Sequence, residues 1–332
     1  MKKTERYFVI DFLRGFSMLI IIFIHTGAYF LSNKAVFFLW DAGEFAVVVF
    51  IFCSCYIVFK KHLAENLHLL TYVKKRAARL IVPYYIFLIF FLSLVYLGEP
   101  KKLTASFLLQ NLLVTGGVDI NWLVLLFLIF SVLIPVLLIL YKKNKTLFYS
   151  YLCLALLSSL FFITNKLSLN YRVTMFLPWS LIVIFSIYFV KYETRRFFLF
   201  SGLVVSLIFF IFLWTILYAH NLSLVMYNNK YPPNLYHLSY GIFFVFLLYL
   251  VGKQPFMSIP IIKKFFFFMS SQSYSIYFVH FLVIYVLTVF FRIKFTWESF
   301  FLAVFLITIV IQLLLGKAKH YLFSTLNRGP II

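Results

Sequence analysis

Hydrophobic residues along the chain form ten long runs, separated by short segments rich in polar and basic residues. The runs lie roughly at residues 8–31, 36–59, 79–97, 120–141, 147–163, 174–191, 197–219, 238–252, 270–291 and 298–316. About 20 mostly apolar residues are enough for a helix to cross a bilayer. Inside lipid such runs must be helical, because no water is present to satisfy the backbone polar groups. The pattern therefore predicts an all-α, polytopic membrane bundle of about ten transmembrane helices, forming a single domain over residues 1–332.

The composition agrees with this interpretation, since 64% of the residues are hydrophobic and only 12% are charged. The formal net charge of +21 would suggest a nucleic-acid partner in a soluble protein. Here the basic residues lie between the apolar runs, which is the pattern of membrane topology, so we expect membrane lipids and no nucleic acid as partners. The three cysteines lie in apolar runs without metal-ligand spacing, and we expect neither a disulfide framework nor a metal site.

The distribution of basic residues also predicts an orientation. If the N-terminus is cytoplasmic, 21 of the 30 Lys and Arg residues lie in inner segments and 8 in outer ones, with Arg14 inside the membrane. Positive charge concentrates on the cytoplasmic side, so we expect both termini there, in a plasma (inner) membrane. The tryptophans then fall near the outer ends of the runs, as an interfacial aromatic belt would; they are Trp40, Trp122, Trp179, Trp214 and Trp297.

The first apolar run contains three ionisable residues, Asp11, Arg14 and His25. At roughly 100° per residue, the helix from Arg14 to His25 returns to within about 20° of the same face and rises about 16 Å. Asp11 precedes Arg14 by one turn and shares that face. Ionisable groups at membrane depth are costly, and they usually face a bundle interior and mark function. The run therefore predicts a functional helix with a charged pair near one membrane surface and an imidazole towards the other.

Arg14-x10-His25, with Asp11-Phe12-Leu13-Arg14-Gly15 in front, resembles the signature of the integral-membrane acyltransferase 3 family. Four later stretches are similar to further motifs of that family, in the same order. They are Phe50-Ile51-Phe52-Cys53-Ser54-Cys55-Tyr56, Arg76-x-x-Arg79 before Pro83, Trp122 with Phe130 and Pro135, and Ser273-Tyr274-x-x-Tyr277-x-x-His280. The chain departs from the family pattern at Phe127, where Glu is usual, and this predicts an altered acceptor site or a divergent branch.

The resemblance implies an acyl-CoA-dependent O-acyltransferase. Such an enzyme moves an acyl group, commonly acetyl, from cytoplasmic acyl-CoA to a hydroxyl of a cell-envelope glycan or its lipid-linked precursor. Acetyl-CoA would then be the co-substrate. Two other functions remain open. One is a non-catalytic polysaccharide export or assembly protein on the same scaffold. The other is a solute transporter with His25 as a proton relay. Transporters often have interrupted hydrophobic runs in paired halves, and no such pairing is evident here.

His25 is the candidate general base, since histidine suits proton transfer near neutral pH. Its depth from the outer surface matches that of Glu44 in the second run, so we expect Glu44 to orient the imidazole and stabilise its protonated form. Asp41 is shallower and is the rival for that role. The alternatives are that His25 is a structural histidine and that one or both carboxylates lie among the lipid headgroups.

Arg76 and Arg79 are the candidate phosphate ligands, because arginines one turn apart on a helix form a fork for the phosphates of coenzyme A. The alternative is ordinary positive-inside bias. Ser273, Tyr277 and His280 share one helix face. We expect them in the inner half of the membrane at the level of Arg14, lining the donor channel together with it. A purely structural hydrogen-bond network remains open for Ser273 and Tyr277.

Overall fold

The computed structural model describes residues 7–65, 67–165, 170–291 and 294–326, with side chains to residue 318. Its helices are α1 (Phe8–Gly27), α2 (Lys34–Ala42), α3 (Phe45–His62), α4 (Leu69–Gly98), α5 (Ala105–Leu112), α6 (Asn121–Lys143), α7 (Lys145–Thr164), α8 (Tyr171–Thr174), α9 (Phe176–Tyr192), α10 (Arg196–Ala219), α11 (Leu235–Gly252), α12 (Pro260–Ser271), α13 (Ser273–Val286) and α14 (Trp297–Leu326). No strand occurs in the described residues. Ten segments are long and apolar enough to cross a membrane, which confirms the predicted all-α membrane bundle.

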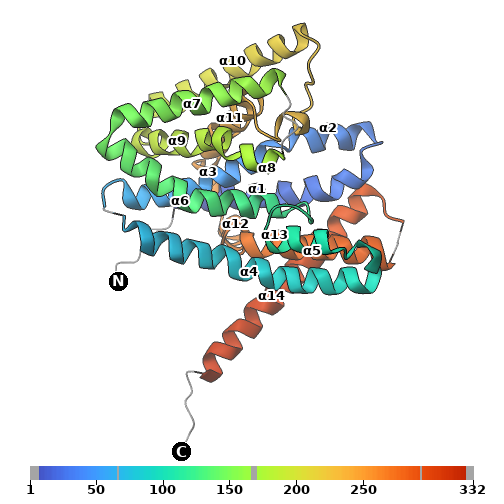
Figure 1. The fold of residues 1–332 in the computed structure, drawn as a ribbon. Helices are drawn as coiled ribbons and strands as arrows, with labels where there is room; N and C mark the ends of the chain where they lie inside the picture. The colour runs from blue at the N-terminus through green and yellow to red at the C-terminus, as the bar shows by residue number, and fades with distance from the viewer. Residues whose placement is uncertain (1–6, 66, 166–169, 292–293, 327–332) are drawn as a thin grey trace, which may run out of the picture.

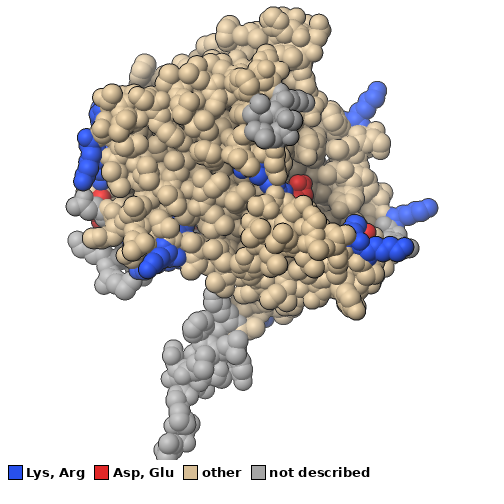
Figure 2. Space-filling model, in the orientation of Figure 1, with Lys and Arg blue, Asp and Glu red and all other residues tan. Residues whose placement is uncertain are grey.

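Most of the long helices run side by side, so that most connections gather at two opposite ends of the bundle, whereas α14 projects out of it obliquely (Figure 1). We call the end where α1 begins and α3 and α6 finish the basic end; Lys142 there donates to the His62 carbonyl at 2.9 Å. The opposite end, where α1 finishes and α3 and α6 begin, is the far end. Charged side chains lie mostly towards the two ends, and most of the face between them is uncharged (Figure 2). The arrangement is that of a bundle whose sides contact lipid.

Burial separates central from peripheral helices. The apolar window of the segment Lys34–His62, which comprises α2 and α3, is 83% buried, whereas those of α7 and α10 are 17% buried. Close helix approaches surround α3 and α1. A Cβ on Gly241 of α11 would clash with the Val48 side chain, and one on Gly15 of α1 would lie 2.9 Å from the Phe266 carbonyl of α12. Small residues permit such approaches between membrane helices. The packing therefore places α1 and α3 at the centre, where the polar residues of the sequence motifs lie.

Two predicted spans are interrupted rather than continuous. The second run is divided at Gly43 and Glu44 into α2 and α3, and the ninth is divided at Gln272 into the end of α12 and α13. The third run begins ten residues earlier than expected, because α4 starts at Leu69 and continues through the basic turns that hydropathy assigns to a loop. These three differences decide where the functional side chains lie.

The tryptophan belt is also only partly as expected. Trp122 and Trp179 do lie at the far end, but they are 5% and 0% exposed. Their rings stack 6.2 Å apart inside the bundle. They pack the interior of the far end rather than anchoring it at a lipid interface. The predicted location of both termini on the cytoplasmic side stays a prediction.

A buried carboxylate joins three helices at the basic end. Glu193, directly after α9, accepts hydrogen bonds from Tyr56 of α3 at 2.6 Å and Tyr249 of α11 at 2.8 Å, and it pairs with Lys60. Glu193 is 4% exposed. Hydrogen bonds to a charged group contribute about 1.5–3 kcal/mol each. The cluster therefore fixes the positions of α3, α9 and α11 relative to one another.

Glu193→Ala is expected to lower the free energy of unfolding by on the order of 3 kcal/mol, because two tyrosine hydroxyls and an ammonium lose a buried partner. Thermal unfolding of the purified protein in detergent measures the effect. Glu65→Ala is the matched control, since this carboxylate lies at the same end but is exposed. Equal unfolding temperatures for the two variants would contradict the structural role of Glu193.

Candidate active site

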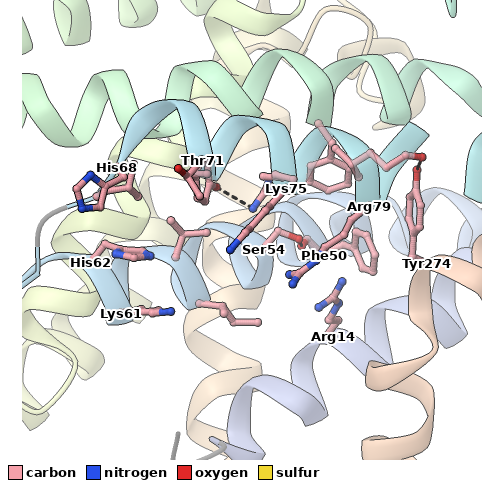
Figure 3. Close-up of a pocket in the computed structure, with 17 residues that line it drawn as sticks. Arg14, Phe50, Ser54, Lys61, His62, His68, Thr71, Lys75, Arg79 and Tyr274 are labelled. Atoms are coloured by element: carbon pink, nitrogen blue, oxygen red, sulfur yellow. Dashed lines mark hydrogen bonds between the residues drawn. The ribbon is translucent and has the colours of Figure 1, made fainter. Parts of the chain in front are cut away.

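A cavity of about 630 Å³ opens at the basic end, between α3 and the first turns of α4 (Figure 3). Its lining carries seven basic or imidazole side chains and, among the described residues, no carboxylate. They are Arg14, Lys61, His62, His68, Lys75, Arg76 and Arg79. A pocket of this size lies in the range of small-molecule and cofactor sites. Its charge favours an anionic ligand.

Two helix faces bring these residues together. On α4 the lining residues recur at helical spacing, from His68 through Tyr72 and Lys75 to Arg79. On α3 the lining residues Phe50, Ser54 and Lys61 likewise recur at helical spacing. Helical periodicity thus turns two otherwise apolar helices into two facing polar walls.

The two motif arginines of α4 lie in this wall, as the sequence predicts. Arg76 donates from Nη1 to the Tyr72 hydroxyl at 3.0 Å, and its Nε is buried with no hydrogen-bond partner among the described residues. Arg79 is exposed and extends from α4 towards Arg14 in the close-up (Figure 3). Unpaired buried donors are rare in proteins. The Arg76 guanidinium therefore retains a donor for a ligand.

Arg14 lies at the deep end of the cavity, where α1 meets α3. Its guanidinium is 5.4 Å from the ring centroid of Phe50. Asp11, one turn earlier, accepts a hydrogen bond from Ser270 of α12 at 2.6 Å. The charged pair predicted on the first helix therefore has two roles: Arg14 faces the cavity, and Asp11 holds α12 against α1.

His25 lies towards the far end of α1 and contacts a second imidazole. Its Nδ1 is 2.7 Å from Nε2 of His280, and the two rings are nearly parallel with centroids 5.0 Å apart. Nδ1 of His280 is 2.8 Å from the carbonyl oxygen of Ile276. Because a carbonyl only accepts, His280 must carry its proton on Nδ1, and its neutral ring then accepts at Nε2. His25 consequently donates from Nδ1, which leaves the lone pair on its Nε2.

The described residues offer no hydrogen-bond partner to Nε2 of His25. The chain from the Ile276 carbonyl through His280 to His25 therefore fixes the tautomer of His25 and presents a basic nitrogen. In hydrolase triads, a neighbouring carboxylate orients the catalytic imidazole in this way. Here the orienting group is a second histidine.

A second, smaller cavity adjoins His25. Its volume of about 20 Å³ is enough for one water molecule. The lining comprises Ile21, Ile24, His25, Val47, Trp122, Leu123, Lys230, Tyr231 and Tyr277. This lining combines four aliphatic and three aromatic side chains with His25 and Lys230, and it lies at the far end.

The same four helices, α1, α3, α6 and α13, line both cavities. On α3, Phe50 of the large cavity lies three residues from Val47 of the small one. On α6, Phe127 lies four residues from Leu123 in the same manner, and the Phe50 and Phe127 rings are 6.1 Å apart. The two cavities therefore lie along one seam between these helices, and the Phe50–Phe127 pair lies between the large cavity and the small one.

The carboxylates predicted beside His25 lie elsewhere. Glu44 is fully buried and pairs with Lys230 at 2.7 Å, and Asp41 accepts from the backbone N–H of Tyr227 at 3.3 Å. Neither makes a hydrogen bond to His25. Depth in one continuous helix predicts both carboxylates near His25, but the break at Gly43 and Glu44 separates α2 from α3. The hydrogen-bond partner of His25 is His280.

Ser273, Tyr277 and His280 were expected at the level of Arg14, and this is wrong for Tyr277 and His280. Tyr277 lines the small cavity and donates to the Ile120 carbonyl at 2.8 Å, whereas Ser273 is buried and lines neither cavity. The physical reason is that α12 packs beside the half of α1 nearest the basic end, so α13 starts further towards the far end. Tyr274 takes the expected place in the large cavity.

Several site residues were missed by the sequence argument. Lys61 and Lys75 line the large cavity but were assigned only to the positive-inside distribution, and His62 and His68, which also line it, were not considered. Extending the helical period of α4 back to His68 would have found two of them. Lys230 was counted as an outer loop residue, and no local pattern marks it as buried.

The comparisons with known proteins give the family. The sequence matches the family described as an acyltransferase domain over residues 7–316, nearly the whole chain. No curated protein and no solved structure matches it. Because the match includes both cavities and every motif described above, the chain belongs to the acyltransferase 3 family of membrane acyltransferases.

Proposed function

We propose that the protein transfers an acyl group, acetyl in the first instance, from cytoplasmic acyl-CoA to a hydroxyl of a cell-envelope glycan or its lipid-linked precursor. The observation that carries this proposal is the seam: one set of four helices lines a basic cavity at one end and the His25 pocket at the other. The positive-inside distribution of Lys and Arg supports a cytoplasmic location for the basic end, in the plasma (inner) membrane.

The large cavity suits coenzyme A by its positive charge and its volume. Arginine binds phosphate oxygens through two parallel N–H donors, and Arg76 and Arg79 supply that geometry from one helix face. Arg14 at the deep end would then contact the part of the donor closest to the thioester. The absence of a carboxylate from the described lining removes a source of repulsion.

The chemistry follows from the tautomer of His25. The acceptor hydroxyl gives its proton to Nε2 as its oxygen attacks the thioester carbonyl. The C–O bond forms, the C–S bond breaks, and the coenzyme A thiolate takes the proton from His25. Throughout, Nδ1–H of His25 stays hydrogen-bonded to His280, which keeps the ring in place.

A direct assay tests the proposal. Purified protein in lipid vesicles receives acetyl-CoA labelled in the acetyl group, and a lipid-linked glycan fraction is analysed by mass spectrometry. Incorporation of acetyl into the glycan, dependent on the protein, is the expected result. Donor binding without any transfer to a hydroxyl would contradict it and favour an export or assembly role.

Phe127→Ala is expected to broaden the range of acyl groups transferred, because Phe127 narrows the seam between the two cavities. The ratio of butyryl to acetyl transfer should rise about tenfold or more, a change in line with the 10–200-fold selectivity of apolar pockets. Phe130→Ala is the control, since this buried ring on the same helix lines neither cavity. An unchanged ratio in Phe127→Ala would show that the acyl group does not pass this pair.

A further inference from the structure

A lysine is buried beside His25, and the proposed mechanism does not yet use it. Lys230 is 4% exposed, and its Nζ lies 2.7 Å from Oε2 of Glu44. The ammonium is also 5.0 Å from the ring centroid of Tyr231 and 5.5 Å from that of Trp122. Buried ammonium groups are expensive, and an ion pair recovers that cost only with excellent geometry. A residue maintained at this expense next to a base needs an explanation.

The loop that carries Lys230 is built to hold it in place. Asn229 donates to the carbonyls of Ser223 and Val225, both at 2.8 Å. Asn234 donates to the Asn229 side chain at 2.6 Å, and its own oxygen caps the start of α11. The loop is therefore fixed on both sides of Lys230 by side-chain hydrogen bonds. Such fixation is what a site residue requires, because its position must be defined before the substrate arrives.

Lys230 and His25 line the same water-sized cavity. An ammonium has three donors, and among the described residues the Lys230 ammonium donates one hydrogen bond, to Glu44. Two aromatic faces surround the group without accepting a conventional hydrogen bond. At least one N–H therefore remains for a group placed in the cavity, within reach of the atom on which His25 would act.

We propose that Lys230 is a catalytic residue that binds the carbonyl oxygen of the acyl thioester and stabilises the negative charge that develops there. This inference rests on the proposed function. Glu44 keeps the ammonium charged and directs it, which gives the buried carboxylate a role next to Lys230 instead of next to His25.

In the reaction, the acceptor oxygen forms a bond to the carbonyl carbon while its proton moves to His25. The carbonyl π-electron pair moves onto oxygen, where the Lys230 ammonium donates to it. Collapse of this intermediate restores the C=O bond, breaks the C–S bond and leaves the electron pair on sulfur, which takes the proton from His25. Lys230 gives up no proton, and the ester and free coenzyme A balance the two substrates.

Lys230→Met is expected to lower kcat about 10²–10³-fold, the usual effect of removing one oxyanion donor. The KM for acetyl-CoA should change little, because its phosphates bind in the large cavity at the other end. Since the single variant leaves Glu44 buried without its partner, the decisive protein is Lys230→Met combined with Glu44→Met. Replacing both members of a buried pair by apolar residues is commonly neutral for folding.

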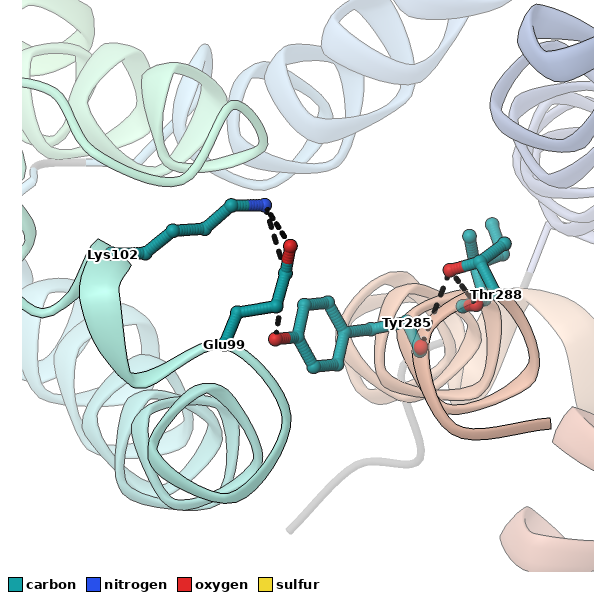
Figure 4. A network of polar contacts seen from close by, with 5 residues as sticks. Glu99, Lys102, Tyr285 and Thr288 are labelled. Carbon is teal, nitrogen blue, oxygen red and sulfur yellow. Dashed lines mark hydrogen bonds and ion pairs between the residues drawn. The ribbon is translucent and has the colours of Figure 1, made fainter. Parts of the chain in front are cut away.

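The matched control is the other Lys–Glu pair of the far end, Lys102 with Glu99 (Figure 4). The Lys102 side chain is 58% exposed, and its hydrogen bond holds the pKa of the Glu99 carboxyl below the usual value. Combining Lys102→Met with Glu99→Met should leave kcat unchanged.

Kinetics, acetyl-CoA affinity and unfolding temperature are measured on all these proteins. The role of Lys230 would be overturned if the Lys230/Glu44 double variant folds, binds acetyl-CoA and has a kcat near that of the wild type. Such a result would mean that the ion pair is only structural. So would a loss of kcat that tracks a fall in unfolding temperature. A wild-type protein that binds acetyl-CoA but transfers nothing would instead refute the proposed function, so the two failures are distinguishable. Low kcat with preserved affinity and unfolding temperature in the double variant is the expected result.

Discussion

His25→Gln is expected to lower acyl transfer per folded molecule by about 10²–10⁴-fold, the contribution of a well-placed general base. The glutamine side chain is able to donate to Nε2 of His280, so it preserves the hydrogen bond that His25 makes from Nδ1 at 2.7 Å. It cannot accept a proton at neutral pH. The variant therefore separates the structural contribution of His25 from its basicity, and its affinity for acetyl-CoA should match that of the wild type.

His237→Gln is the matched control for this experiment. His237 is a fully buried histidine of α11 that packs edge-on against Trp179 at 5.7 Å and lines neither cavity. Substitution there should leave the rate of acyl transfer near the wild-type value. Near wild-type activity in His25→Gln would remove His25 from the mechanism. The hydrogen bonds from His25 through His280 to the Ile276 carbonyl would then have no catalytic role.

Features that depend on local periodicity could be predicted from the sequence. The all-α architecture follows from the length of the apolar runs, and the shared face of Arg14 and His25 follows from helix geometry. The structure places these two residues at the two cavities of a single seam. Arg76 and Arg79 likewise face the large cavity, because a one-turn spacing fixes their common side whatever the tertiary packing.

Features that depend on the relative heights of helices could not be predicted. Depth counting assumed continuous spans, so the breaks at Gly43 and Gln272 displaced every residue that follows them. His280 was accordingly assigned to the level of Arg14, whereas it contacts His25. The burial of Lys230 could not be predicted either, because no local sequence pattern distinguishes a buried lysine from an exposed loop lysine. The ion pair with Glu44, 186 positions away in the sequence, distinguishes them.

Combining Arg76→Ala with Arg79→Ala is expected to weaken acetyl-CoA binding about 10²-fold or more. Each charge-assisted hydrogen bond contributes about 1.5–3 kcal/mol, and two such losses correspond to at least that factor in Kd. The kcat at saturating donor should change less than the affinity, because His25 and Lys230 lie at the other cavity. Replacing both arginines by lysine should restore only part of the affinity, since lysine keeps the charge but lacks the planar fork.

The control for charge alone is the pair Arg195→Ala and Arg196→Ala, at the same end of the bundle but outside the cavity. This variant should bind acetyl-CoA as the wild type does. Isothermal titration with acetyl-CoA and with a phosphate-free acetyl-pantetheine thioester then isolates the phosphate contribution. If Arg76 and Arg79 bind phosphate, the wild type should prefer acetyl-CoA strongly and the Arg76/Arg79 double variant should prefer it much less. An equal loss of affinity for both thioesters would mean that the arginines act on the shape of the cavity, and the phosphate assignment would fail.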